Sequence, residues 1–207
     1  MTWTIWLQFA GVCMLGAMSP GPSLAMVLQQ TTRGGRSSGL AAASGHALGV
    51  GLYALAAAQG LALLMAAHPL LFRIIAGLGA AYLVWLGVQG LRAAARPRAA
   101  AGATTAAAAP TSAWTAARTG LAVSLSNPHL AVMFVALLSQ FVTVDMPASG
   151  QALLIVTAMG LDFGWYALLT LLISQPAVLG GLHRKARWID GCGGALMLLL
   201  GLRILMV

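Results

Sequence analysis

Met18-Ser19-Pro20-Gly21-Pro22 lies in the middle of the first long apolar segment of the sequence. Proline has no backbone N–H and its ring clashes with the preceding helical turn, so this stretch leaves the carbonyls of Gly16 and Met18 without their helical partners. A second stretch of the same kind, Ser126-Asn127-Pro128, follows about half a chain later and frees the carbonyl of Ser124. The sequence therefore predicts two helices that are each broken at a proline.

The composition places these breaks in a membrane. Of the 207 residues, 60% are hydrophobic and only 7% are charged, and the mean hydropathy is +0.90. Soluble domains carry about 25% charged residues, so this chain cannot cover a water-facing surface and is an integral membrane protein. The net charge of +8 comes from basic residues in short loops between apolar segments, a distribution that indicates membrane topology and not nucleic-acid binding.

The apolar segments predict six membrane-spanning helices, since a spanning helix needs about 20 apolar residues. The segments are 3–29, 39–66, 70–92, 116–143, 149–175 and 187–206. The stretch 93–115 differs from them, because it is rich in Ala, Thr and Pro, a composition typical of a flexible linker. We therefore expect a first three-helix part over 1–92, a cytoplasmic linker over 93–115 and a second three-helix part over 116–207.

Similar motifs recur in these two halves. Gly77-x-Gly79-Ala80-Ala81 aligns with Gly191-x-Gly193-Gly194-Ala195, and the same register pairs Leu86-Gly87 with Leu200-Gly201. Because three spans is an odd number, the second half must enter the membrane inverted. The predicted fold is an all-α membrane protein of two inverted three-helix repeats, the first helix of each being broken at proline. Paired interruptions in such repeats mark the binding site of a secondary transporter.

Loop charge predicts the orientation, because cytoplasmic loops carry an excess of Lys and Arg. Nine of the eleven basic residues lie in or beside the loops that join spans one to two, three to four and five to six: Arg33, Arg36, Arg92, Arg96, Arg98, Arg118, Arg184, Lys185 and Arg187. The other two are Arg73 and Arg203. Both termini are therefore expected outside the cytoplasm.

Several motifs together carry a family resemblance. They are Gly16-x-x-x-Pro20-Gly21-Pro22, Gly35-Arg36-x-x-Gly39-Leu40, Gly79-Ala80-Ala81-Tyr82-Leu83, Asn127-Pro128-His129 with Gln140-Phe141-Val142, and Trp165-Tyr166. In order and spacing the chain resembles the lysine-exporter/threonine-resistance (LysE/RhtB) family of bacterial amino-acid exporters. The resemblance implies export of small amino acids or their derivatives across the bacterial inner membrane, driven by a proton or ion gradient. The chain departs from the family pattern at His129, where lysine is usual, and at Ser139, where proline is usual.

The two breaks offer partners for both charges of an α-amino acid. The N-terminal N–H groups of the helix after Pro22 suit a carboxylate, and free carbonyls suit an ammonium. We predict a substrate site formed by Ser19, Pro20, Gly21, Pro22, Ser23, Ser126, Asn127, Pro128 and His129. These small, neutral residues favour neutral substrates such as homoserine, threonine or leucine. The alternative is a plain proline kink satisfied by neighbouring side chains.

Asp162 is the only acidic residue inside a predicted span, where an ionisable side chain indicates function. At 1.5 Å per residue it lies about 20 Å from the periplasmic end of its helix, and His46 lies about 10 Å from the cytoplasmic end of its own. In a bilayer of about 40 Å the two side chains come within about 10 Å in depth. We expect Asp162 and His46 to carry the coupling proton of an antiporter. The alternative for each is a structural hydrogen bond between helices.

Other classes of protein fit the sequence less well. Ala42-x-Ser44-Gly45 is near an intramembrane protease motif, but His46 points away from Ser44 on a helix. A membrane thiol-electron carrier would hold a cysteine near each break, whereas Cys13 and Cys192 lie in the first and sixth segments. The sequence does not exclude the interpretation as a passive channel for small solutes. No catalytic residue, metal site or cofactor is expected; the expected partners are amino acids and lipids, and glycine-rich helix faces would allow a homodimer.

The orientation can be tested by fusion. A phosphatase that is active only in the periplasm, fused after Val207, should be active, because the loop charges place the C-terminus there. The same enzyme inserted into the linker 93–115 serves as the control and should be inactive. The opposite pattern of activities would reverse the orientation.

Overall fold

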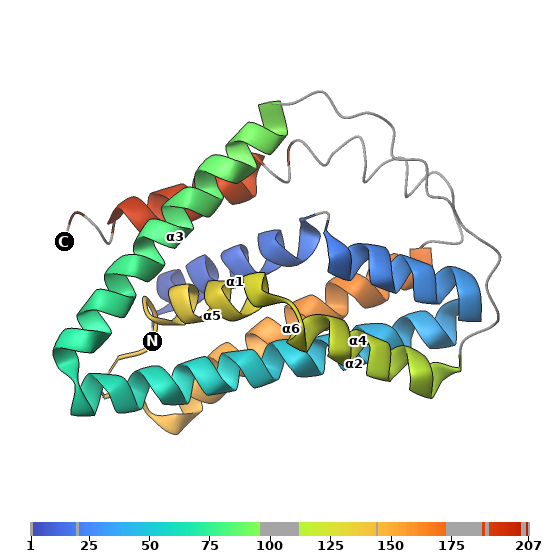
Figure 1. Cartoon of the computed structure of the whole chain (residues 1–207), viewed down its shortest axis with the longest axis horizontal. Coiled ribbons are helices and arrows are strands. Elements are labelled where there is room, and N and C mark those ends of the chain that lie inside the picture. Colours follow the sequence, from blue (N-terminus) through green and yellow to red (C-terminus); the bar gives the residue numbers. More distant parts are fainter. Residues whose placement is uncertain are drawn as a thin grey trace.

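The computed structural model describes residues 2–19, 21–95, 112–143, 145–172, 188, 191–203 and 206. These residues form helices with no strand (Figure 1): α1 (Trp3–Met18), α2 (Pro22–Ala67), α3 (Pro69–Ala95), α4 (Ala113–Leu125), α5 (Pro128–Leu138), α6 (Ala148–Leu172) and a C-terminal helix (Gly191–Arg203). Most of the predicted linker 93–115 lies outside the described residues. So do Pro20, the C-terminal end of the fifth predicted segment and most of the N-terminal end of the sixth.

The number of spanning helices is confirmed only in part. Three described helices are long and apolar enough to cross a membrane: Pro22–Ala67, Pro69–Arg92 and Ala148–Leu172. A fourth span results if α4 and α5 are counted as one broken helix, since they pass the same test together and meet at a bend of 62°. The other two described helices, α1 and Gly191–Arg203, are apolar but shorter. The chain is thus an all-helical integral membrane protein, and the six-helix inverted repeat stays a prediction.

One predicted loop proved to be a single-residue turn. The expected loop between spans one and two falls inside α2, which has 46 residues. A straight helix of that length would measure about 70 Å, more than twice the hydrocarbon core of a bilayer. Gly35, with φ 72° and ψ −167°, interrupts it, and only glycine adopts such a φ readily. The chain reverses there (Figure 1), so that Gly39 packs against Thr31 from the other side of the turn.

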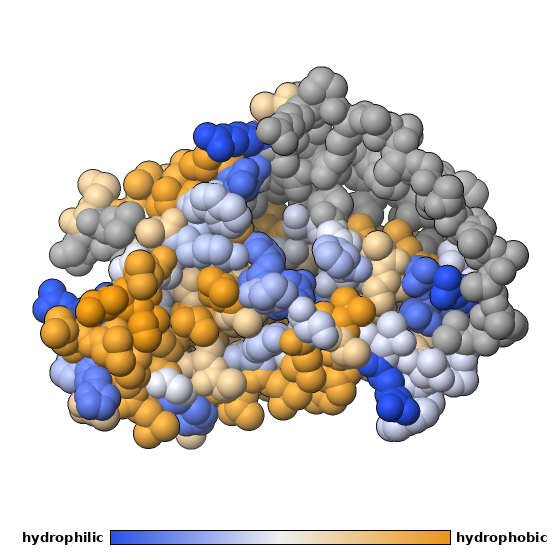
Figure 2. All heavy atoms as spheres, in the orientation of Figure 1, coloured by the Kyte–Doolittle hydropathy of each residue, from blue (hydrophilic) through white to orange (hydrophobic). Residues whose placement is uncertain are grey.

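Many large apolar side chains are exposed on the surface of the protein. Leu63, Leu70 and Val156 are 71%, 72% and 65% exposed. Figure 2 shows apolar atoms over the end of the molecule where α2 meets α3. Contiguous apolar surface of this kind has to be covered by another apolar medium, and lipid is the medium that suits spanning helices.

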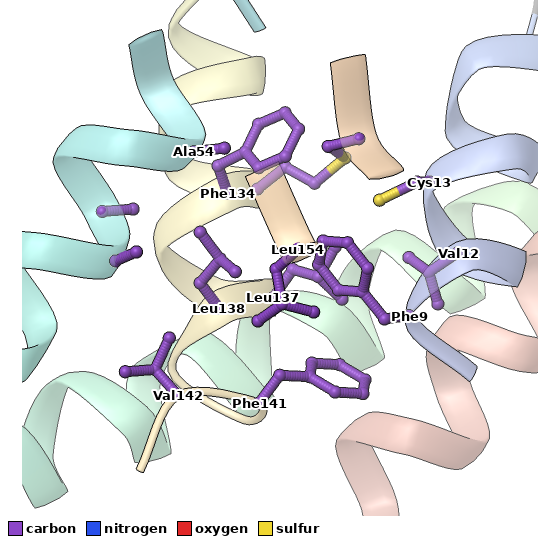
Figure 3. Close-up of a cluster of buried hydrophobic side chains, with 14 of the residues drawn as sticks. Phe9, Val12, Cys13, Ala54, Phe134, Leu137, Leu138, Phe141, Val142 and Leu154 are labelled. Carbon is purple, nitrogen blue, oxygen red and sulfur yellow. The ribbon is translucent and has the colours of Figure 1, made fainter. Parts of the chain in front are cut away.

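The interior contains two apolar clusters. The larger one gathers Phe9 of α1, Leu137 and Leu138 of α5 and Leu154 of α6, all fully buried (Figure 3). The smaller one surrounds Val27 and lies between the first part of α2, α4 and α6. These two clusters pack the broken helices against one another.

Glycines bring α2 and α4 into backbone contact. A Cβ atom on Gly45 would overlap the carbonyl of Ala117, and one on Gly120 would overlap the carbonyl of Ala42. Gly49 lies against the side chain of Ser124. Gly45 and Gly49 are four residues apart on one face of α2, and the role of this pair is close helix packing. Because α4 covers this face within the chain, it offers no surface for the homodimer that we expected glycine faces to allow.

This packing predicts the effect of adding one methyl group. Gly45→Ala should destabilise the protein by about 1–3 kcal/mol, since the methyl group meets backbone that cannot rotate away. Gly60→Ala in the same helix is the matched control, because nothing lies within 4 Å of a Cβ there. The measurement is the thermal unfolding midpoint of each purified protein in detergent. Equal midpoints for the two variants would mean that α2 and α4 are not in contact.

Candidate functional site

Both breaks border one cavity of about 390 Å³. Its wall is built by α1, α2, α3, α5, α6 and the C-terminal helix. Eight of the predicted site residues line it: Ser19, Gly21, Pro22, Ser23, His46, Asn127, His129 and Asp162. Ser126 and Pro128 belong to the second break but do not line the cavity, and Pro20 lies outside the described residues. The volume is in the range of small-molecule sites.

The first break ends α1 with a capped C-terminus. The N–H of Ser19 donates to the carbonyls of Leu15 at 3.1 Å and Gly16 at 3.2 Å. The prediction that the Gly16 carbonyl is free was therefore wrong, because the chain tightens into a turn before the prolines. The N-terminus of α2 differs, because Gly21 occupies the N-cap position and has no side chain to bond the first N–H groups. This end of α2 borders the cavity and carries the positive end of the helix dipole.

The second break is also satisfied from within the protein. The N–H of Asn127 donates to the carbonyl of Ser124 at 3.1 Å, so this carbonyl is not free as predicted. The side-chain oxygen of Asn127 caps α5 by accepting from the N–H of His129 at 3.1 Å. The hydroxyl of Tyr53 donates to the carbonyl of Leu125 at 2.6 Å. Tyr53 was not predicted, because a tyrosine far along the chain carries no local signal of the carbonyl it satisfies.

A buried chain of polar contacts runs beside the cavity. Nδ1 of His46 lies 2.8 Å from Oδ2 of Asp162, and Nε2 of His46 lies 2.8 Å from Oγ of Ser23. His46 is 1% exposed, Asp162 is 6% exposed and Ser23 is 9% exposed. The ring of Tyr166 meets the imidazole edge-on, with centroids 5.3 Å apart. The predicted proximity of His46 and Asp162 is confirmed, and Ser23 extends the pair to the first break.

A second pair of polar side chains is formed by His129, which lines the cavity, and Tyr82. Nδ1 of His129 lies 2.9 Å from the hydroxyl of Tyr82, and the Tyr82 ring stacks on Trp85 with centroids 5.5 Å apart. This contact joins α5 to α3. Gln89 also lines the cavity from α3. The sequence contained no sign of these roles, because a single polar residue in an apolar segment does not indicate which way it faces.

The geometry also bears on the rival interpretations. The hydroxyl of Ser44 is exposed and donates to the carbonyl of Leu40 at 2.9 Å, so the serine in the protease-like motif is not the one that His46 contacts. Cys13 is buried, Cys192 is exposed, and both are free thiols. Within the described residues no group of three His, Cys, Asp or Glu side chains could hold a metal ion.

Comparison with known proteins identifies the family. The family described as LysE type translocator matches residues 14–207. The chain belongs to this family. Its members are transporters, so this translocator is not an enzyme, and the protease and electron-carrier interpretations no longer apply.

Three relatives show what the translocator is similar to. The threonine efflux protein of Escherichia coli is 29% identical over 97% of both chains. The leucine efflux protein of Klebsiella pneumoniae is 34% identical over 66% of this chain and 63% of its own. The homoserine/homoserine lactone efflux protein of Salmonella typhimurium is 29% identical over 92% of this chain and 86% of its own. No solved structure matches the chain.

The cap at the second break can be tested against a cap elsewhere. Asn127→Ala removes a helix cap that lies at the cavity, whereas Ser112→Ala removes the N-cap of α4, which does not line it. Both variants should lose about 0.5–2 kcal/mol of stability, the usual cost of such a cap. Only Asn127→Ala should lose transport, measured per folded molecule in membrane vesicles. Equal transport by the two variants would mean that the second break is a structural kink.

Proposed function

We propose that this translocator exports neutral amino acids across the bacterial inner membrane in exchange for protons. The observation that carries the proposal is that both proline breaks and the His46–Asp162 pair border the same cavity. A substrate there would touch the broken helices and the ionisable pair together. The relatives named as threonine, leucine and homoserine efflux proteins support an amino-acid substrate.

The cavity has complementary groups for both ends of an amino acid. The uncapped N-terminus of α2 at Gly21 and Pro22 suits the carboxylate, because backbone N–H groups and the helix dipole both favour an anion. Since the carbonyls of Gly16 and Ser124 are already bonded, we assign the ammonium to side-chain oxygens that line the cavity. These are the hydroxyls of Ser19 and Ser23 and the amide oxygen of Asn127, which can accept a second bond.

A two-fold relation between the halves would allow the cavity to open to either side in turn. A methyl group on Gly87 would lie 2.7 Å from the carbonyl oxygen of Gly194, and one on Gly201 would lie 2.7 Å from the carbonyl oxygen of Ala80. Gly87 and Gly201 are equivalent in the motif register, as are Ala80 and Gly194. Reciprocal contacts between equivalent positions are what a two-fold axis requires, and they support the inverted three-helix repeats. The loop charges support the proposal that both termini lie in the periplasm.

Export can be tested in cells and vesicles. Overexpression should protect a bacterial host against inhibitory concentrations of single neutral amino acids, and a screen over amino acids and their analogues identifies the substrate. In inside-out vesicles, uptake of that substrate should rise above equilibrium and collapse when an uncoupler is added. Movement that only follows the substrate gradient and ignores the uncoupler would instead indicate a passive channel.

The ionisable pair supplies the driving step in this proposal. Asp162 and His46 take up a proton from the periplasm as the substrate leaves and release it to the cytoplasm when the next substrate molecule binds. Asp162→Asn keeps the shape of the side chain and an acceptor for His46 Nδ1, but it cannot ionise. It should therefore block uphill export and spare substrate-for-substrate exchange. Trp114→Phe, at an exposed position outside the cavity, is the control and should keep both activities. Normal uphill export by Asp162→Asn would make this residue structural.

A further inference from the structure

Ser23 belongs to two sites at once. It is the second residue of α2, so it stands at the helix N-terminus that borders the cavity, and its hydroxyl is also bonded to the buried imidazole of His46. We propose that Ser23 couples protonation to substrate binding, because its hydroxyl reverses direction when His46 gains a proton. This inference rests on the proposed function and names the residue through which the proton and the substrate compete.

The neutral state of His46 fixes the hydroxyl in one direction. The carboxylate of Asp162 can only accept a hydrogen bond, so Nδ1 of His46 carries the hydrogen and donates it. Nε2 of the neutral ring then has only a lone pair, and the hydroxyl of Ser23 must donate to it. The lone pairs of the Ser23 oxygen are left for the cavity, where they can accept from a substrate ammonium. The negative charge of Asp162 adds to this attraction.

Protonation reverses the bond. Both ring nitrogens of a charged imidazole are donors, so Nε2 of His46 now donates to the Ser23 oxygen. The hydroxyl hydrogen of Ser23 turns toward the cavity, where it opposes an ammonium. The charge of the His46–Asp162 pair also changes from negative to neutral. Each change weakens binding of the amino group, so the protonated protein releases the substrate, as an antiporter requires.

The surroundings of His46 assign the exchanged proton to this pair. The titratable side chains that contact His46 are Asp162 and Tyr166 of α6, and Cys13 of α1 lines the same cavity; from α4, the backbone of Gly120 lies against the backbone of His46. Phenols and thiols titrate above neutral pH in water, whereas an imidazole titrates near neutrality. On α5, His129 lines the same cavity but bonds to Tyr82 on α3. Among the described residues, the His46–Asp162 pair is thus the titratable pair that contacts a residue of the first break, Ser23, directly.

Linkage provides the test, because a proton that weakens substrate binding must be expelled when substrate binds. The purified full chain is titrated with the amino acid found in the resistance screen, and two quantities are measured: the affinity at pH 5.5 and pH 8, and the protons released on binding in weakly buffered solution. Wild type should release protons and lose affinity at the lower pH by a factor between about 5 and 150, the usual range of coupling between two sites.

Three variants separate the possible outcomes. Ser23→Ala should lose less affinity at the lower pH than wild type and release fewer protons, because it lacks the hydroxyl and keeps only the charge of the His46–Asp162 pair as a link between the sites. Ser23→Thr keeps a hydroxyl and should keep the linkage. Ser44→Ala removes an exposed serine of the same helix and should match wild type in every measurement.

Several results would overturn the inference. Proton release by Ser23→Ala equal to that of wild type would show that Ser23 does not couple the two sites. So would the absence of any binding by Ser23→Ala at both pH values while Ser23→Thr binds normally, because Ser23 would then be a binding residue and no more. Failure of wild type itself to release protons would refute proton antiport, which is a failure of the proposed function and is distinguishable from the others.

Discussion

The architecture depends on the requirement that every backbone group freed by a broken helix in a membrane finds a partner. Water is absent from the bilayer core, so these partners must come from the protein or from a cavity. At the second break they are the N–H of Asn127, the side chain of Asn127 and the hydroxyl of Tyr53. At the first break the N–H of Ser19 closes α1. The N-terminus of α2 is the end without a side-chain cap, and it is the end that borders the cavity.

Close packing makes this arrangement possible. Because Gly45 and Gly120 have no side chains, α4 lies directly on α2, and the second break is held near the first. The reversal at Gly35 folds the two parts of α2 together, which sets Ser23 of the first part against His46 of the second. The polar contacts at the centre of the protein thus follow from glycines: Gly35 supplies the positive φ of the reversal, and at Gly45 and Gly120 a side chain would not fit.

Polarity is distributed to match the two environments of the chain. The outer faces of the helices expose leucine and valine, and several buried polar side chains, among them Thr31, His46 and Ser139, are paired with another side chain or with backbone. An unpaired ionisable group inside a membrane is costly. The pairing of His46 with Asp162 lowers this cost and holds both side chains beside the cavity.

Local properties of the chain could be predicted from the sequence alone. Proline removes a backbone donor wherever it stands, so both breaks were predictable, and the shortage of charged residues was enough to indicate a membrane protein. The family could be identified from motifs with fixed spacing. The depth estimate even predicted that His46 and Asp162 lie near each other, since the rise per residue is a constant of the helix.

Contacts between polar groups on different helices could be seen only in the folded protein. Ser23 and Asp162 lie 23 and 116 positions from His46, and the rotation of each helix about its axis decides whether such side chains touch. The carbonyls of Gly16 and Ser124 were predicted to be free, but the local turns bond them, and Tyr53 reached the carbonyl of Leu125 from 72 positions away. Sequence pattern specifies periodicity and length along one helix. The partners across helices are set by packing of the whole chain, in which small residues such as Gly45 allow one approach and exclude others.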